Sequence, residues 1–276
     1  MSSPAEQIRK SLEEKLGAPV LEVLQTAGRE ARRLGFRAYL VGGVVRDLHR
    51  GFGNTDIDIV IEGDGIAFAR VLARRYEAKL RSYQRFGTAT ILFPTGFKID
   101  VATARLEIYD RPAALPRVRP GRIEDDMHRR DFTVNAMAVD LTPLSFGEVL
   151  DPFGGSADVE GKTIRVLHDR SFVDDPTRIF RAVRFEGRLG FRMDESTEAL
   201  VRDALTSGIL DRLEDYRFVA ELDLILREEG SRRMILRLEA LGVLGPVRAR
   251  ARGSRLLRKT LNEVESVMSP GRPKGS

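Results

Sequence analysis

The 276-residue sequence has no cysteine, no tryptophan and only three histidines. Without cysteine it can form neither a disulfide nor a thiolate metal site, which suits a reducing or a hot cytoplasm. His49, His128 and His168 lack the spacing of a metal site, and no Ser/His/Asp or Cys/His arrangement is present. The sequence also lacks a signal peptide and any apolar run of membrane-spanning length. We therefore expect a cytoplasmic protein with no membrane partner and no thiol or triad chemistry.

Positive charge is in excess over negative charge. The formal net charge is +5 at pH 7, and the isoelectric point is about 9.7. Only seven of the 46 basic residues are lysines, so arginine dominates. Arginine makes bidentate contacts to phosphate and stacks on bases, although a GC-rich coding bias produces the same excess. The composition therefore favours a polyanionic partner such as RNA without establishing one.

Two adjacent glycines follow a short apolar segment near the start of the chain. Tyr39–Val41 is typical of a buried strand, and residues 44–50 are typical of a short helix. Gly42 and Gly43 let the backbone approach a phosphate with its N–H groups exposed, and the helix N-terminus adds partial positive charge. Arg46 on this helix can reach toward a triphosphate. The segment therefore predicts a phosphate-binding turn.

Three acidic residues on predicted strands indicate a metal site. Asp56 and Asp58 are two residues apart at the start of a β-branched strand, so their side chains point to one face. Two carboxylates on one face are unfavourable unless a cation neutralises them, and hard oxygen ligands suit Mg²⁺. Asp100 lies in another predicted strand, over residues 97–102, and could complete a site for two metal ions. Without the glycine turn, solvated acids at a strand edge would be the better interpretation of Asp56 and Asp58.

Four segments follow one another in a fixed order. They are Leu40–Asp47 with Asp56–Asp58, Arg129–Ala136, Asp151–Asp158 and Asp174–Phe185. Together they resemble the motifs of the class II tRNA nucleotidyltransferases and bacterial poly(A) polymerases, over about residues 39–244. In that family the second motif holds the ribose and phosphates of the incoming nucleotide. The third is a hinge between the catalytic head and the neck, and the fourth selects the base.

The resemblance implies a role for each candidate residue. Catalysis and the binding of two Mg²⁺ ions fall to Asp56, Asp58 and Asp100. The triphosphate of CTP or ATP would be held by Gly42, Gly43, Arg46 and Arg105, and the ribose would be placed by Arg130, Asp131 and Asn135. The base would be read by Asp175 and Arg178, while phosphate or primer RNA would be contacted by Arg181 and Arg184.

The base-selecting pair also has a physical rationale. Asp175 and Arg178 are three residues apart on either side of Pro176, which is typical of a helix start, so we expect them to share a helical face. A carboxylate accepts from an exocyclic amino group, and a guanidinium donates to a ring nitrogen or carbonyl. Cytosine and adenine present an amino donor beside a ring-nitrogen acceptor, whereas uracil and guanine present the opposite order. One such pair can therefore admit CTP and ATP; a surface ion pair is the alternative.

The predicted elements and the resemblance favour an α+β fold. We expect a nucleotidyltransferase head of the polymerase-beta-like kind, with a mixed β-sheet and helices, followed by an all-helical neck. Residues 1–36 would form helices that pack on the head, 37–150 the head, 151–245 the neck, and 246–276 a basic, partly disordered segment. Residues 109–122, rich in proline and arginine, would form a mobile loop.

These observations predict a template-independent enzyme that adds CMP or AMP to the 3′ end of tRNA. Whether it adds C, CC, A or the whole CCA remains open, as does poly(A) addition to general RNA 3′ ends. A catalytically inactive RNA-binding module is the alternative from a different class. We expect no DNA partner, and the oligomeric state stays open. Relatives of this kind usually have further helical domains, so the chain is either a short natural enzyme or part of a longer one.

Overall fold

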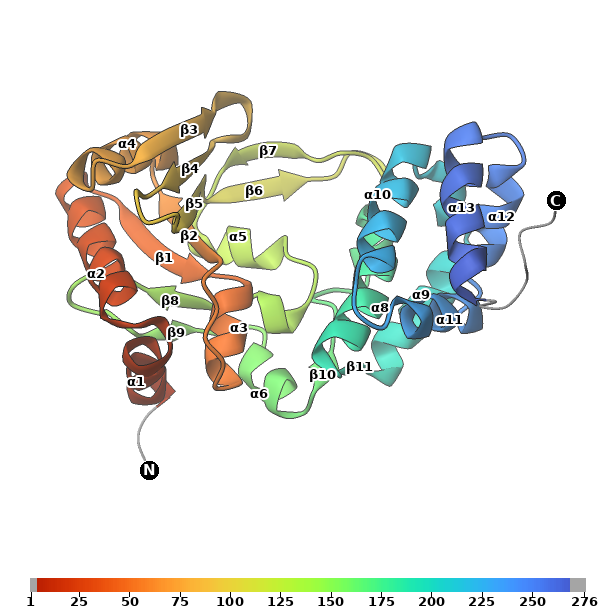
Figure 1. Ribbon diagram of the computed structural model, residues 1–276, viewed down its shortest axis with the longest axis horizontal. Coiled ribbons are helices and arrows are strands. Elements are labelled where there is room, and N and C mark those ends of the chain that lie inside the picture. The colour runs from red at the N-terminus through yellow and green to blue at the C-terminus, as the bar shows by residue number, and fades with distance from the viewer. Residues whose placement is uncertain (1–3, 269–276) are drawn as a thin grey trace. The chain divides into compact units, whose positions relative to one another are not determined.

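The computed structural model describes residues 4–268 and contains two compact units (Figure 1). The first unit comprises residues 1–108 and 117–161, and the second comprises 109–116 and 162–276, as far as each is described. The first contains the mixed sheet and the second is almost entirely helical. The predicted α+β class, with a mixed-sheet head followed by a helical region, is confirmed.

A seven-stranded sheet forms the centre of the first unit, with strand order β3-β4-β5-β2-β1-β8-β9. The strands are β1 (Arg37–Val41), β2 (Ile57–Glu62), β3 (Lys79–Tyr83), β4 (Thr88–Leu92), β5 (Lys98–Thr103), β8 (Ala138–Asp140) and β9 (Val149–Leu150). Only β2 and β5 pair in parallel, and every other neighbouring pair is antiparallel. The parallel pair fixes the register that matters for the site, because it places Asp58 opposite Asp100.

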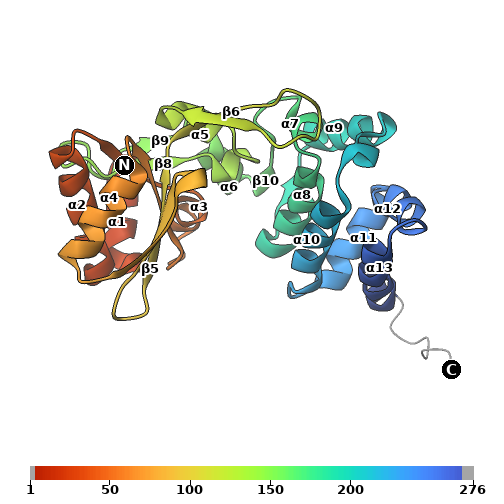
Figure 2. The ribbon, with the colours of Figure 1, turned by 90° about the horizontal axis from the view of Figure 1, so that it is seen from above.

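Helices cover one face of this sheet, and Figure 2 shows α2 and α4 together on that side. The helices of the first unit are α1 (Pro4–Leu16), α2 (Ala18–Arg33), α3 (Gly43–His49), α4 (Gly65–Arg75), α5 (Ile123–His128) and α6 (Gly155–Glu160), with 3₁₀ turns at Gln84–Phe86 and Thr133–Asn135. Strand residues alternate between the faces. On the face away from α4, Tyr39, Val41 and Val60 pack with Ile123 and Met127 of α5.

The second unit is built from helices α7 (Ser171–Asp174), α8 (Thr177–Leu189), α9 (Glu195–Thr206), α10 (Asp215–Leu226), α11 (Ser231–Ala240), α12 (Leu244–Ala251) and α13 (Arg255–Met268). A 3₁₀ turn, Ile209–Arg212, and two short paired strands, β10 (Thr163–Ile164) and β11 (Arg192–Met193), complete it. Phe180 of α8 and Phe218 of α10 meet edge to face, with ring centroids 5.8 Å apart. This aromatic contact sits in a core that holds α8 in place. Arg178 of the predicted base-reading pair lies in α8, whereas Asp175 precedes the helix in an extended conformation, so the two do not share a helical face as predicted.

The structure corrects the prediction for residues 109–122. The prediction of an unstructured loop over 109–122 is wrong in part, because β7 (Arg117–Pro120) pairs with β6 (Arg105–Ile108). All four residues of β7 are exposed, so the strand has no buried face that would distinguish it from a loop. Of the segment 246–276, predicted to be partly disordered, residues 269–276 lie outside the described residues. No helix in the described part combines the length and apolar character needed to cross a membrane.

Candidate active site

A glycine turn connects β1 to α3 at the edge of the candidate site. Gly42 has φ of 78° and ψ of −141°, a conformation that residues with a side chain rarely adopt. A Cβ atom at Gly42 would lie 3.3 Å from Nη1 of Arg130 and 3.6 Å from Oδ2 of Asp58. The turn therefore brings exposed backbone, a guanidinium and a carboxylate together. These are three of the residues that the sequence assigned to nucleotide and metal binding.

The three predicted metal ligands lie on the sheet face away from α4. Asp58 of β2 pairs with Asp100 of β5, and Asp56 immediately precedes β2. The Nζ atom of Lys98 lies 2.9 Å from Oδ1 of Asp56 and 3.1 Å from Oδ2 of Asp100. The hydroxyl of Thr90 donates to Oδ1 of Asp100 at 2.5 Å. One ammonium thus links two of the three carboxylates.

Asp58 is the carboxylate least compensated by positive charge. Burial raises its pKa to about 6, and the negative charges of Asp56 and Asp100 add to the effect, whereas Arg130 and Lys98 oppose it. A raised pKa means that the ionised form is unfavourable in its surroundings. A bound cation would relieve this cost.

The carboxylate oxygens of Asp56, Asp58 and Asp100 are suitable ligands for Mg²⁺, but they are not already arranged around an ion position. In residues 4–268, no group of three or more His, Asp or Glu side chains is arranged to hold a metal ion. Lys98 lies between Asp56 and Asp100 in this arrangement. The three carboxylates offer only oxygen ligands, which is what Mg²⁺ selects, and they repel one another without a cation. The residues therefore suit the ion once the ammonium moves aside.

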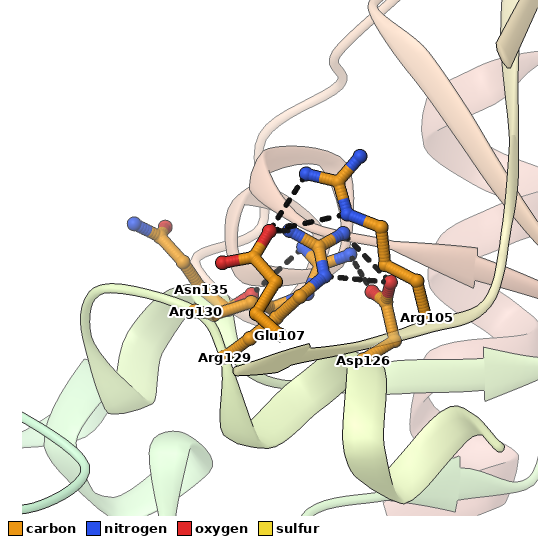
Figure 3. Close-up of polar contacts among 6 residues, drawn as sticks. All are labelled: Arg105, Glu107, Asp126, Arg129, Arg130 and Asn135. Carbon is orange, nitrogen blue, oxygen red and sulfur yellow. Dashed lines mark hydrogen bonds and ion pairs between the residues drawn. The ribbon is translucent and has the colours of Figure 1, made fainter. Parts of the chain in front are cut away.

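A buried ion cluster holds Arg130 in place (Figure 3). Asp126 of α5 is fully buried, and its Oδ1 accepts from Nε and Nη2 of Arg129 at 3.0 and 2.6 Å. Its Oδ2 accepts from Nη2 of Arg130 at 2.9 Å, while Nη1 of Arg130 donates to the carbonyl oxygen of Asn135. Burial alone would raise the pKa of Asp126, but Arg130 and Arg129 outweigh it and hold that pKa below its usual range. Arg130 is thus pre-oriented beside Gly42.

Arg105, predicted to hold the triphosphate, joins the same cluster through Glu107. Its Nε and Nη2 donate to Oε1 of Glu107 at 3.1 and 2.7 Å, and Nη1 of Arg129 lies 3.5 Å from that oxygen. Figure 3 shows the guanidinium of Arg105 at the top of the cluster, joined to the carboxylate of Glu107. The side chain of Arg105 is about a quarter exposed, so it is partly accessible to solvent.

Arg46 is placed differently from the expectation that it reaches outward to a triphosphate. It is only 4% exposed, and its guanidinium donates to both carboxylate oxygens of Asp47 and, at 2.7 Å, to Oδ1 of Asn135. Nδ2 of Asn135 donates in turn to Oδ1 of Asp131, which is also buried. These residues form a connected support beneath the turn, and their direct contact with a nucleotide stays a prediction.

In the second unit, the side chains of both predicted base-reading residues form hydrogen bonds to other side chains. Oδ1 of Asp175 accepts from the hydroxyl of Thr177 at 2.6 Å and from Nη2 of Arg217 at 2.7 Å. Arg178 is 5% exposed and donates from Nη1 to the hydroxyl of Ser171. Nη1 of Arg217 also donates to the carbonyl oxygen of Ala113. Arg217 therefore fixes the orientation of Asp175.

Arg181 and Arg184 both lie near the ring of Phe185 on α8. Their guanidinium carbons are 5.6 and 5.9 Å from the ring centroid. Burial lowers the pKa of Arg184, an effect that Glu221 partly offsets and Arg181 reinforces. These arginines line one side of a helix, and their contact with RNA stays a prediction.

Sequence reasoning missed three residues that organise the site. Lys98 could have been found, because it is two residues before Asp100 and therefore on the same strand face. Asp126 could also have been found, because it precedes Arg129 and Arg130 by helical spacings of three and four. The contact of Arg217 with Asp175 spans 42 residues and has no local signal in the sequence.

Comparisons with known proteins find related sequences. A family model described as the poly A polymerase head domain matches residues 38–165. An A-adding tRNA nucleotidyltransferase from Geobacter sulfurreducens is 48% identical over 229 residues, which cover 83% of this chain and 26% of the relative. Other relatives are named CC-adding tRNA nucleotidyltransferase and CCA-adding enzyme.

Solved structures give the same result. A CCA-adding enzyme in an apo form has a TM-score of 0.84 and 42% identity, covering 87% of this chain and 57% of that one. A Thermotoga maritima CCA-adding enzyme complexed with tRNA has a TM-score of 0.77 and 40% identity, with coverage of 87% and 55%. Further similar structures are complexes of CCA-adding enzyme with CTP and with ATP. This chain spans 23% to 53% of the length of three A-adding relatives.

Proposed function

Because this chain belongs to the family of tRNA nucleotidyltransferases and bacterial poly(A) polymerases, we propose that it adds nucleotides to the 3′ end of RNA. The observation that carries this proposal is the pair Asp58 and Asp100 on neighbouring strands beside Gly42 and Arg130. Carboxylates can hold cations, and a glycine turn with a guanidinium can hold phosphates. This combination suits metal-assisted attack of a hydroxyl on a phosphorus atom.

Each group of the site has a part in the proposed reaction. Asp56, Asp58 and Asp100 would hold two Mg²⁺ ions, which when bound would make the attacking hydroxyl more acidic and stabilise the departing pyrophosphate. Lys98 would give up its contacts to Asp56 and Asp100 in that state. The backbone at Gly42 and Gly43, with the nearby Arg130, would bind the triphosphate oxygens of CTP or ATP. Arg105, held by Glu107, would add a further positive charge.

Buried polar residues would position these binding groups. Asp131 and Asn135 would place the ribose together with Arg130, whose guanidinium is anchored by Asp126. Arg46 would act mainly through Asn135 and the turn, since it is 4% exposed. Such preorganisation lowers the cost of orienting the substrate.

The second unit would select the base, and the first would be the catalytic head. Asp175 and Arg178 would read the Watson–Crick edge of cytosine or adenine, with Arg217 holding the carboxylate in orientation. Arg181 and Arg184 would lie toward phosphate or primer RNA. Residues 151–245 would form the neck, with 246–276 as a basic extension; residues 1–36 would support the head.

The names of the relatives guide the choice of acceptor and donor. A-adding tRNA nucleotidyltransferases match at 48% and 46% identity, whereas a CC-adding enzyme matches at 38%. We therefore place AMP transfer from ATP to a tRNA ending in CC first. CMP addition and general poly(A) addition are the reactions against which it must be tested.

The test uses three transcripts: a tRNA ending before CCA, the same tRNA ending in CC, and an RNA with an unrelated 3′ end. Each is incubated with labelled CTP or ATP, with Mg²⁺ or with a chelator. We expect Mg²⁺-dependent incorporation of AMP into the tRNA that ends in CC. Incorporation into every RNA would favour poly(A) addition, and CTP incorporation into the shortest tRNA would assign the earlier steps. Absence of incorporation into any of them would overturn the proposed function.

A further inference from the structure

A straight row of paired residues crosses the sheet through the carboxylates. Val41 pairs with Asp58, Asp58 with Asp100, Asp100 with Thr90, and Thr90 with Arg81. Directly paired residues point their side chains to the same face. Arg81 on β3 therefore points to the face that carries the site, at the opposite end of the row from the glycine turn.

The edge strand β3 presents a basic and aromatic strip on this face. Lys79, Arg81 and Tyr83 alternate along the strand and are all exposed. The intervening Leu80 is partly buried. Helix α4 lies on the other face, since the backbone N–H of Gly65 donates to Thr103, which points away from Asp100. Figure 1 shows β3 as the outermost strand of the sheet.

The cations of this strip differ from the arginines around the turn. Arg105, Arg129 and Arg130 are bound to Glu107 or Asp126. The side chains of Lys79 and Arg81, by contrast, form no hydrogen bond or ion pair with any residue from 4 to 268. They remain available to a ligand, and the charge they carry suits a phosphate diester.

The geometry of the proposed reaction indicates which ligand would contact Lys79 and Arg81. In an in-line displacement the attacking hydroxyl and the departing pyrophosphate lie on opposite sides of the phosphorus atom. The proposed function, on which this inference rests, places the triphosphate at the Gly42 and Arg130 end of the row. The attacking RNA strand must then approach from the other end, where Arg81 lies.

We propose that Arg81, supported by Lys79 and Tyr83, binds the backbone of the acceptor RNA next to its 3′-terminal nucleotide. Strand spacing puts the Cα atom of Arg81 about 10 Å from that of Asp100. This leaves room for one nucleotide whose 3′-hydroxyl lies at Asp100 and whose 5′ phosphate meets the guanidinium. Tyr83, at 51% exposure, offers a ring on which a preceding base can stack.

The experiment combines Arg81→Ala with a matched control, Arg74→Ala. Arg74 is an exposed arginine of α4, on the opposite side of the sheet, and its loss changes the net charge equally. RNA affinity is measured by fluorescence anisotropy of a tRNA transcript ending in CC, at several salt concentrations. Steady-state incorporation then gives KM separately for RNA and for ATP.

We expect Arg81→Ala to weaken RNA binding about 3- to 10-fold and to lower the salt slope by about 0.7, the loss of one phosphate contact. KM for ATP should stay unchanged, and Arg81→Lys should restore the salt slope. Unchanged RNA affinity, an effect equal to that of Arg74→Ala, or a rise only in KM for ATP would each overturn the assignment. The binding measurement tests Arg81 independently of turnover, so absent incorporation would count against the proposed function alone.

Discussion

Two carboxylates of the first unit, Asp126 and Asp58, have opposite electrostatic surroundings. Asp126 is fully buried and surrounded by two guanidiniums, and its pKa is lowered. Asp58 is mostly buried beside two other carboxylates, and its pKa is raised to about 6. The carboxylate of Asp126 is paired with two guanidiniums, whereas three carboxylates, Asp56, Asp58 and Asp100, share the ammonium of Lys98, which contacts only Asp56 and Asp100.

This contrast separates a supporting cluster from a binding site. A buried carboxylate that already has its cations contributes to the fold and orients its partners. A carboxylate that still repels its neighbours makes the fold less stable by itself and gains from a cation that arrives later. Removal of the carboxylate charge should therefore destabilise the fold at Asp126 and, in the absence of metal, stabilise it at Asp58.

The largest expected effect is on activity. Asp58→Asn should reduce nucleotide incorporation by about 100- to 1,000-fold or more, the scale on which one preorganised electrostatic group contributes. Glu22→Gln, at an exposed position of α2, is the control for charge loss and should keep full activity. Rates are measured under single-turnover conditions with saturating Mg²⁺. Near-normal activity of Asp58→Asn would show that the metal assignment is wrong.

The second-largest expected effect is on stability and concerns the cluster of Asp126, Arg129 and Arg130. Asp126→Asn should lower the free energy of unfolding by about 3 kcal/mol, because it leaves Arg129 and Arg130 without their buried partner. Since the folded-state pKa of Asp126 is lowered, its contribution is present above its ordinary pKa of 3.8 and is lost as the pH falls through the lowered value. Urea unfolding at several pH values measures both. A loss below about 1 kcal/mol, the usual range for a surface pair, would contradict the cluster's role.

In the absence of metal, removing the charge of Asp58 should change the free energy of unfolding in the opposite direction. Its folded-state pKa of about 6 exceeds its ordinary value of 3.8, so ionisation destabilises the fold increasingly as the pH rises between these values. Asp58→Asn should therefore raise the free energy of unfolding by about 1–3 kcal/mol at pH 7, and the gain should vanish near pH 4. Urea unfolding in a chelator at pH 4, 6 and 7.5 measures this. A variant less stable than the wild type at pH 7 would remove the contrast with Asp126.

The smallest expected effect concerns Asp175, which has one arginine partner but remains partly exposed. It is intermediate between the two clusters. Asp175→Ala should reduce the preference for CTP and ATP over UTP and GTP by about 10-fold, because one hydrogen-bond acceptor for the base is lost. Asp203→Ala, at an exposed position of α9, is the matched control. Competition among the four nucleotides gives the ratio, and unchanged discrimination would refute the base-reading role.

Local patterns predicted much of the fold and the centre of the site. The two-residue spacing of Asp56 and Asp58 placed both on one strand face, and the adjacent Gly42 and Gly43 predicted the turn. Pro176 predicted a helix start, and α8 begins at the next residue. These features depend on neighbours a few residues away, so the sequence contains them directly. Strand β3 escaped prediction because only one of its five residues is apolar and partly buried.

The sequence by itself therefore determined which residues could bind a metal, a phosphate or a base. Only the tertiary structure decided which partners each of these side chains has. Arg46 turns inward to an asparagine 89 residues away, and Asp175 is held by an arginine 42 residues away. The pairing of β3 with β4 puts Arg81 in line with Asp100. Such contacts depend on how distant segments pack, and burial then sets whether a charge is satisfied or left for a ligand.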